Sequence, residues 1–557
     1  MGIHTGSVNQ NVRSTSSIKT AISPTREENY AAWYQAVITA ADLADNSPVR
    51  GCMVIKPWGY GIWEMIQKDL DHRIKATGHV NAYFPLLIPL SFLEKEAAHV
   101  EGFAKECAVV THHRLIANTE GKLIPEGELE EPYVIRPTSE TLIGAMYAKW
   151  IQSYRDLPVL INQWANVMRW EMRTRLFLRT SEFLWQEGHT AHATEQEAVE
   201  ETKKMLEVYA DTLSEILAIP VIKGEKPVWE RFPGAVNTYS VEAMMQDRKG
   251  LQAGTSHFLG QNFAKAANIQ FLNRQSELEH AWTTSWGVTT RLIGALIMVH
   301  SDDNGLVLPP RVAPQQVIIL PIYRNDEERA VVLNYAKTIE NLITSQNYSH
   351  QPIRVLTDDR DLRGGEKIWQ WIKKGAPIRI EIGPRDVASS QFVLSTRTSD
   401  PKDKHIFKLE DLKNNPLSNQ NINQNINPHL SLNLISQLLE QMHTALLKKS
   451  SDFLSAHTRE IDNLHEFKQF FTPPHIASKK NPEKNPEKNA ENQSEENTGI
   501  HGGFAISYAL DTPEIENYLK PLKITARCIP ESSVHDTGIC LFTGKPNAKK
   551  MIFAKAY

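Results

Sequence analysis

The stretch RWEMRTRLFLRTSEF, residues 169–183, decides how this 557-residue chain is interpreted. Strand-like runs lie at 160–171 and 183–194, and we expect them to pair antiparallel because the connection between them is short. Four side chains of the stretch suit a nucleotide: Arg169, Glu171, Arg179 and Phe183. An arginine on a strand can hold a phosphate through paired donors, and a phenyl ring can stack on a base. The alternative is an exposed hairpin with a basic turn and no ligand.

Two further stretches flank this hairpin. Before it, a helix is predicted from Pro57 to about Gly78, and the strand-like run VNAYFPLLIP follows at 80–89. After it, TTSWGVTTRLIGALIMV, residues 283–299, predicts a strand that runs into a helix beginning near Arg291. A helix N-terminus with an added cation is a good phosphate site. Taken alone, each stretch is also explained by an ordinary helix–strand unit.

In this order, the three stretches resemble motifs 1, 2 and 3 of the class II aminoacyl-tRNA synthetases. Pro85 stands at the motif 1 proline, and Arg291 stands at the motif 3 arginine. RPTSET, residues 136–141, resembles the Thr-x-Glu loop of class IIa, in which Thr138 and Glu140 hold the substrate amino group. A helix N-cap followed by an acidic first turn would fit the same residues. The resemblance implies an α+β catalytic domain with an antiparallel sheet flanked by helices.

The segments FLRTSEFLWQEGHTAHA (177–193) and QAGTSHFLGQNF (252–263) resemble prolyl-tRNA synthetases of the archaeal and eukaryotic type. This resemblance covers about residues 25 to 410. It implies a proline–tRNA ligase, which activates proline with ATP to prolyl-adenylate and pyrophosphate and then transfers the prolyl group to tRNA(Pro). The implied proline-binding residues are Thr138, Glu140, Arg169, Trp185, Glu187 and His257. The implied ATP-binding residues are Arg169, Glu171, Arg179, Thr180, Phe183, Gln252, Thr255 and Arg291.

The family also implies what the chain needs besides its own residues. Mg²⁺ would bridge the ATP phosphates, and we expect no metal held by the protein itself. Related enzymes usually carry a zinc-binding C-terminal domain with four cysteines, whereas only Cys528 and Cys540 lie in that region here. A tetrahedral zinc site needs four ligands, so we expect no structural zinc. Family chains end in a tyrosine that docks near the active site, which assigns that role to Tyr557.

Composition shifts divide the chain into four parts. The expected parts are a loose N-terminus at 1–24, a catalytic domain at 25–310, an anticodon-binding domain at 311–412 and a C-terminal domain at 413–557. The proline-bearing stretch GLVLPPRVAP marks the end of the catalytic part. Two low-complexity insertions are expected in the last part, an Asn-rich one at 413–427 and one with the repeated unit NPEK at 479–497. The last segment should be a small mixed domain.

The third part alternates strands with helices, which predicts an α/β domain with a mostly parallel sheet. It resembles the anticodon-binding domain of class IIa enzymes, most clearly in KKGAPIRIEIGPRDV at 373–387. Seven cations give it basic character: Arg354, Lys367, Lys373, Lys374, Arg379, Arg385 and Arg397. Single-stranded anticodon bases are the kind of RNA that proteins read well. The alternative is that these cations are ordinary solvated charges on a small α/β domain and bind no RNA.

Overall composition narrows the class of protein. The chain has 61 Lys and Arg against 65 Asp and Glu, for a net charge of −4, so it does not coat nucleic acid through bulk charge. With only four cysteines, a disulfide scaffold is excluded. No secretory signal and no apolar run long enough to span a bilayer is found. We therefore expect a cytoplasmic protein that binds neither membrane nor DNA. The resemblance implies a homodimer of the protein-synthesis machinery, with tRNA(Pro), L-proline and ATP as partners.

Two other functions have to be considered for this sequence. Another class IIa synthetase, such as the threonyl enzyme, would hold a catalytic zinc through Cys and His, but no Cys lies between residues 108 and 527. A non-catalytic paralogue would have no need of an intact ATP-binding set. The segment between Arg179 and Gly287 is too short for a large editing insertion, so we expect no editing within this chain.

Overall fold

The computed structural model of the 557-residue chain describes residues 21–95, 106–400, 402–413, 433–473 and 500–557. Most of the expected loose N-terminus therefore lies outside the described residues. The two low-complexity insertions also lie outside them, apart from Lys413.

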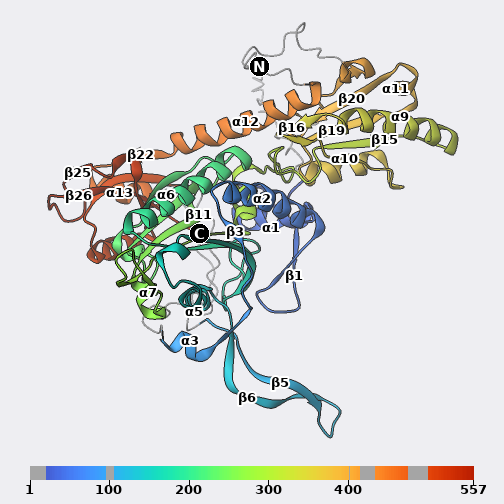
Figure 1. Cartoon of the computed structure of the whole chain (residues 1–557). Coiled ribbons are helices and arrows are strands. Elements are labelled where there is room, and N and C mark those ends of the chain that lie inside the picture. Colours follow the sequence, from blue (N-terminus) through green and yellow to red (C-terminus); the bar gives the residue numbers. More distant parts are fainter. Residues whose placement is uncertain (1–20, 96–105, 401, 414–432, 474–499) are drawn as a thin grey trace, which may run out of the picture.

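A single large sheet forms the centre of the molecule (Figure 1). Its catalytic part runs in the order β9 (Ile222–Glu225), β10 (Asn237–Met244), β11 (Gly250–Gly260), β14 (Trp282–Thr289), β8 (Glu182–His192), β7 (Val159–Met168) and β3 (Val80–Asn81). Every pairing from β9 to β7 is antiparallel, and only β3 joins in parallel. The predicted antiparallel hairpin is confirmed as β7 and β8, and the antiparallel catalytic sheet is confirmed with it.

Helices cover one face of this sheet because their apolar positions recur at helical spacing. The covering helices are α1 (Tyr30–Ala40), α2 (Pro57–Ala76), α6 (Glu195–Asp211) and α8 (Arg291–His300). The helix predicted from Pro57 begins there, and Gly78 follows its end with φ +95°, a conformation that favours glycine. Helix α8 is buried from Leu292 to His300, so it lies inside the core. A capping box of Thr194 and Glu197 fixes the start of α6.

The run predicted as one strand at 80–89 is two strands in two sheets, so that prediction is wrong. After β3 the chain leaves the main sheet, and β4 (Leu87–Pro89) pairs with β6 (Leu123–Ile135) instead. Pro85 has no N–H to donate to a ladder. The bend is held from the side by Arg136, whose guanidinium donates to the carbonyl of Phe84. Strands β5 (Val109–Ala117) and β6 form a long hairpin that projects from the body (Figure 1).

The expected anticodon-binding domain has a five-stranded sheet of mixed direction. Its order is β18 (Val355–Thr357), β15 (Val317–Pro321), β19 (Ile378–Ile382), β20 (Gln391–Thr396) and β21 (His405–Lys408), with helices α9 (Asp326–Thr344), α10 (Gly364–Lys373) and α11 (Pro384–Ala388). Only the two pairings of β15 are parallel. The mostly parallel sheet was therefore a wrong prediction. The short segment between β19 and β20 explains this, because a parallel crossover needs about a dozen residues or more.

The C-terminal strands extend the catalytic sheet. Helix α12 (Leu434–Ala456) runs from the anticodon-binding domain towards them (Figure 1). The strands follow in the order β22 (Thr458–Glu460), β23 (Phe504–Ala509), β26 (Ala548–Ala554) and β24 (Thr525–Pro530), and β24 pairs with β9. This approach requires Gly224, because a Cβ there would lie 2.4 Å from the carbonyl oxygen of Ile529.

The remaining elements are short. They are β1 (Ala44–Asn46), β2 (Met53–Ile55), α3 (Leu90–Lys95), α5 (Glu140–Trp150), α7 (Asn262–Ala267), β12 (Gln270–Leu272), β13 (Leu278–His280), β16 (Asn347–Tyr348), β17 (Gln351–Pro352), α13 (Leu464–Phe471), α14 (Glu516–Leu519) and β25 (Thr537–Gly538), with single helical turns between some of them.

Candidate active site

The predicted site residues meet around one cavity. It has a volume of about 500 Å³ and lies on the face of the sheet opposite the covering helices. Its lining includes every proline- and ATP-binding candidate: Thr138, Glu140, Arg169, Glu171, Arg179, Thr180, Phe183, Trp185, Glu187, Gln252, Thr255, His257 and Arg291. The structure therefore brings all of these candidates together at one cavity, while the role of each residue stays a prediction.

Strand β8 supplies one wall through simple alternation. Successive side chains of a strand point to opposite faces, so Phe183, Trp185, Glu187 and His189 share the face towards the cavity. His189 was not among the residues predicted from the sequence. The period of two along this strand was the signal that could have found it, since His189 continues the series of the three predicted residues.

Strand β11 needs an irregularity to present its residues. Gln252 pairs with Glu242, whereas Gly254 pairs with Val241, so β11 carries an extra residue at Ala253. Such a bulge shifts the alternation by one position. Gln252 and Thr255 consequently both line the cavity although three positions separate them.

The hairpin of β7 and β8 holds Arg169 in place. Its backbone N–H donates to the carbonyl of Ser181 at 2.8 Å, and its Nε donates to the carbonyl of Pro137 at 2.9 Å. The guanidinium carbon lies 5.8 Å from the ring centre of Phe183 and 5.9 Å from that of Trp185. Two aromatic rings and a backbone carbonyl thus orient the Arg169 side chain at the cavity.

Two predicted ATP ligands bind each other. Arg179 Nε and Glu171 Oε2 lie 2.7 Å apart, and the Arg179 side chain is 62% exposed. An ion pair this exposed contributes little free energy, so a nucleotide could separate it. Both side chains line the cavity.

Positive charge is concentrated at the end of the cavity that Arg179 and Arg291 line. Burial, together with the nearby Arg179 and Arg169, lowers the pKa of Arg291 to about 10. Arg291 remains protonated at neutral pH, and its Nε donates to the carbonyl of Leu178 at 3.3 Å. Three guanidinium groups around one cavity repel one another and would be stabilised by an anion such as a polyphosphate.

The other end is small and rich in carboxylates. Thr138 donates through its hydroxyl to Glu140. Glu187 is buried and accepts from three donors, Ser139 Oγ at 2.6 Å, Gln163 Nε2 at 2.7 Å and His189 Nε2 at 2.9 Å. These contacts occupy Glu187 and fix its position. Burial opposes protonation of His189, but the hydrogen bond and charge of Glu187 raise its pKa.

His257 closes this end as a neutral ring. Burial, with a smaller effect of the His189 charge, lowers the pKa of His257 to about 3. Its Nδ1 lies 3.1 Å from the hydroxyl oxygen of Thr238, and its ring centre lies 4.7 Å from that of Phe232. His257 therefore offers a ring nitrogen without charge.

Tyr557 anchors next to the start of β11. Its hydroxyl donates to Asp247 at 2.6 Å, and its backbone N–H donates to the carbonyl of Gly250 at 3.2 Å. The Nζ of Lys249 lies 5.0 Å from its ring centre. These contacts place Tyr557 beside the strand that carries Gln252.

Of the seven cations expected to give the anticodon-binding domain its basic character, three are buried and three are half-buried. Lys367, Arg379 and Arg397 are buried, and Lys367 donates to the backbone carbonyl of Asp358. Arg354 donates to the carbonyl of Ala313. Of the seven predicted cations, only Arg385 is exposed. These cations hold the domain together because buried carbonyls need donors.

Among the described residues, no group of His, Cys, Asp and Glu could hold a metal ion. No helix in the described part of the chain is long and apolar enough to cross a membrane.

An antiparallel sheet of this order, with Arg169 and Glu171 on one hairpin and Arg291 at the start of a buried helix, defines the core of a class II aminoacyl-tRNA synthetase. Residues 123–300 match the family "tRNA synthetase class II core domain (G, H, P, S and T)", and residues 316–415 match "Anticodon binding domain". The chain belongs to the proline–tRNA ligase family, as its curated relatives show.

Three of these relatives cover nearly the whole chain. The proline–tRNA ligase 2 of Anaeromyxobacter dehalogenans is 54% identical over 98% of this chain and 100% of its own length. The proline–tRNA ligase of Bdellovibrio bacteriovorus is 55% identical over 97% of this chain and 99% of its own. That of Rhodopirellula baltica is 56% identical over 97% and 98%.

Proposed function

We propose that this chain activates proline with MgATP to give prolyl-adenylate and pyrophosphate, and then transfers the prolyl group to tRNA(Pro). The observation that carries the proposal is the division of one cavity into two ends. Arg179 and Arg291 lie at one end, Arg169 lies between the ends, and a polar pocket with a neutral imidazole forms the other end. That division suits a polyphosphate beside a small amino acid.

The first step needs positioning more than acid–base chemistry. A carboxylate oxygen of proline attacks the α-phosphorus of ATP, and the bond from this phosphorus to the bridging oxygen of pyrophosphate breaks. No proton has to move, because the nucleophile is already a carboxylate. Arg169 lies between the two ends and would hold the carboxylate and the α-phosphate together, while Arg179 and Arg291 would meet the outer phosphates.

The amino-acid end would recognise proline through its secondary amine. Thr138 and Glu140 would accept from the ammonium group of proline, and Trp185 would form an apolar wall. Glu187 would keep this end in shape, because three donors already occupy it. Such a pocket discriminates against alanine and cysteine only modestly, since a missing methylene group changes binding by about 1–3 kcal/mol.

At the nucleotide end, Phe183 would stack on the adenine base and Glu171 would accept from its amino group. Thr180, Gln252 and Thr255 would contact the ribose and phosphates. Glu171 has to leave Arg179 for this, which couples ATP entry to opening of their ion pair. In the second step, a ribose hydroxyl of the tRNA attacks the adenylate carbonyl and AMP leaves.

We further assign the chain to the archaeal and eukaryotic type of the family, although the three relatives named above come from bacteria. In support, the segment from Arg179 to Gly287 is taken up by β8 to β14 and their helices, with no further domain. The strands after the anticodon-binding domain and the anchored Tyr557 also support this assignment.

A homodimer in the cytoplasm is part of the proposal. Strand β3 is the edge of the main sheet, and Val80 and Tyr83 beside it are 62% and 72% exposed. Apolar side chains at an unpaired sheet edge favour association with a second copy through this segment. Equilibrium sedimentation, with Tyr83→Glu as the interface variant, tests the dimer.

We also propose functional boundaries at 25–310 for catalysis, 311–412 for anticodon binding and 413–557 for the C-terminal part.

Amino-acid-dependent ATP–pyrophosphate exchange tests the function. We expect strong exchange with proline, weaker exchange with alanine and cysteine, and little with threonine, serine or histidine. Arg169→Ala should lower exchange by at least about a thousandfold, as loss of a transition-state contact does. Arg173→Ala is the matched control, because Arg173 lies in the same loop but outside the cavity lining. Preference for another amino acid would refute the pocket assignment, and tRNA binding without exchange would point to a non-catalytic paralogue.

A further inference from the structure

A buried arginine joins the anticodon-binding domain to the catalytic domain. Arg397 follows β20 and is 5% exposed. Its Nη1 and Nη2 donate to both carboxylate oxygens of Asp302, at 2.9 and 2.6 Å. Its remaining hydrogen bonds reach the carbonyls of Gly305, Leu306 and Ile372. One guanidinium thus contacts the end of the catalytic domain, the interdomain connection and the end of α10.

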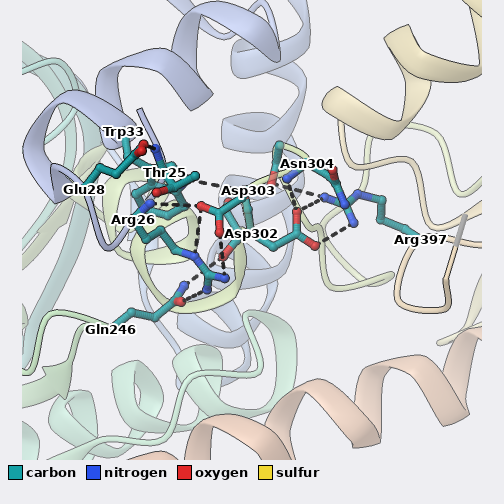
Figure 2. A network of polar contacts seen from close by, with 11 residues as sticks. Thr25, Arg26, Glu28, Trp33, Gln246, Asp302, Asp303, Asn304 and Arg397 are labelled. Atoms are coloured by element: carbon teal, nitrogen blue, oxygen red, sulfur yellow. Dashed lines mark hydrogen bonds and ion pairs between the residues drawn. The ribbon is translucent and has the colours of Figure 1, made fainter. Parts of the chain in front are cut away.

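The residue next to Asp302 continues the contacts on the catalytic side (Figure 2). Asp303 accepts from the backbone N–H and the guanidinium of Arg26 at 3.0 to 3.3 Å. Arg26 in turn donates to Gln246 Oε1 at 2.5 Å. Gln246 donates through its side chain to the carbonyl of Ser301, and through its backbone N–H to that of Met298. The turn between β10 and β11 is therefore tied to the last turn of α8.

Both elements in this network carry predicted ATP ligands. Helix α8 begins with Arg291 and ends at His300, about 14 Å further along at the usual helical rise and two residues before Asp302. Strand β11 follows the turn at Gln246 and carries Gln252 and Thr255. The anticodon-binding domain is thus attached to the catalytic domain at the C-terminal end of one of these elements and next to the turn that precedes the other.

Two further contacts join the domains elsewhere. Trp58 donates to the carbonyl of Lys374 at 2.9 Å, and Lys374 pairs with Asp42, so both contacts involve the region of α1 and α2. A buried ion pair stabilises an interface poorly, because desolvation of its charges is costly. A bidentate pair does, however, fix the relative direction of two planar groups.

We propose that the Asp302–Arg397 pair is a positioning device for tRNA. It sets the anticodon-binding domain relative to α8, so that a tRNA held at its anticodon presents its 3′ end at the adenylate. Asp302 and Arg397 are positioning residues, and neither touches a substrate. This inference rests on the proposed function.

The test separates the two half-reactions and two RNA substrates in the full-length enzyme. Asp302→Asn and Arg397→Lys should each lower kcat/KM for charging full-length tRNA(Pro) about tenfold, and the double variant should lose no more than either single one. Proline-dependent pyrophosphate exchange should stay within about twofold, because it needs no tRNA. Charging of a minihelix with the acceptor stem alone should also stay within about twofold, because a minihelix does not reach the anticodon-binding domain.

Lys404→Gln is the control, since Lys404 pairs with Glu381 inside the anticodon-binding domain, and charging should remain at the wild-type level. Thermal unfolding establishes that each variant is folded. An equal loss of exchange, minihelix charging and tRNA charging would overturn the inference in favour of a local effect on the site. Unchanged tRNA charging in both single variants would overturn it as well. Absence of exchange in the wild-type enzyme would instead overturn the proposed function.

Discussion

At the scale of single residues, the chemistry of the site depends on groups that the protein itself holds in place. Glu187 illustrates this, because each of its oxygens accepts hydrogen bonds from neighbours before any substrate enters. A buried carboxylate is stabilised only with such partners. The predicted role in shaping the pocket is consistent with this arrangement.

Glu187→Gln should raise the KM for proline about tenfold or more and leave the KM for ATP within about twofold. The amide cannot accept from Ser139, Gln163 and His189 as the carboxylate does, so the proline end should loosen. Steady-state exchange at varied proline and ATP measures this. Glu182→Gln is the control on the same strand, because Glu182 is exposed and outside the cavity. A change confined to ATP would contradict the assignment.

His300 gives a prediction for pH. Burial lowers its pKa to about 4, from the usual value of about 6.5. The unfolded chain therefore takes up this proton at a higher pH than the folded chain does. His300 thus stabilises the fold fully above about pH 6.5, and this stability is lost as the pH falls towards 4.

His300→Gln should reduce the slope of unfolding free energy against pH between about pH 6 and 4, by up to about 1.4 kcal/mol per pH unit. Urea unfolding at several pH values measures the slope. His72→Gln, an exposed position, should leave the slope unchanged. Equal slopes for wild type and His300→Gln would refute the prediction.

At the scale of elements, the sequence predicted what short-range patterns determine. The hairpin of β7 and β8 and the start of α8 at Arg291 were predicted correctly, because each depends on alternation, a short connection or helical spacing within about 20 residues. The two strands at 80–89 were not separated. Their division depends on Arg136, which lies about 50 positions further along the chain.

The bulge at Ala253 was also invisible in the sequence, because it is defined by the register against β10. Gln252 could be assigned only through the family resemblance. His189, in contrast, was available from alternation along β8 and was missed.

The pairing of β8 with β14 yields a test of packing. Gly188 lies opposite Trp286, and a Cβ at Gly188 would lie 2.0 Å from the indole ring. Gly188→Ala should therefore destabilise the protein by about 2–3 kcal/mol, because the ring has to move within a packed core. Denaturant unfolding measures this. Gly365→Ala is the control, since no atom lies within 4 Å of the Cβ position there, and it should be neutral or slightly stabilising.

At the scale of the whole molecule, charge joins distant parts of the chain. Arg527 on β24 donates twice to Glu242 on β10, at 2.9 and 2.7 Å, and Lys226 binds the other carboxylate oxygen at 2.8 Å. All three side chains are buried. The sequence could not predict this cluster, or the shared sheet, because pairing across so many residues leaves no local pattern.

Arg527→Met should lower the unfolding free energy by about 3–5 kcal/mol, because it leaves Glu242 with one partner too few in a buried position. Unfolding should still occur in one transition when followed by fluorescence and circular dichroism. Lys550→Met, which breaks an exposed pair with Glu460, should cost less than about 1 kcal/mol. Similar losses of unfolding free energy in the two variants would contradict the larger contribution expected of the buried cluster.

The pairing of β9 with β24 also has a consequence for synthesis on the ribosome. Strand β9 is made roughly 300 residues before its partner, so at 5–20 residues per second it waits about 15–60 s with an open edge. The β9 edge of the catalytic sheet therefore stays unpaired until β24 has been synthesised. A chaperone that shields strand edges would be needed most during this interval, and slow codons late in the message would lengthen it.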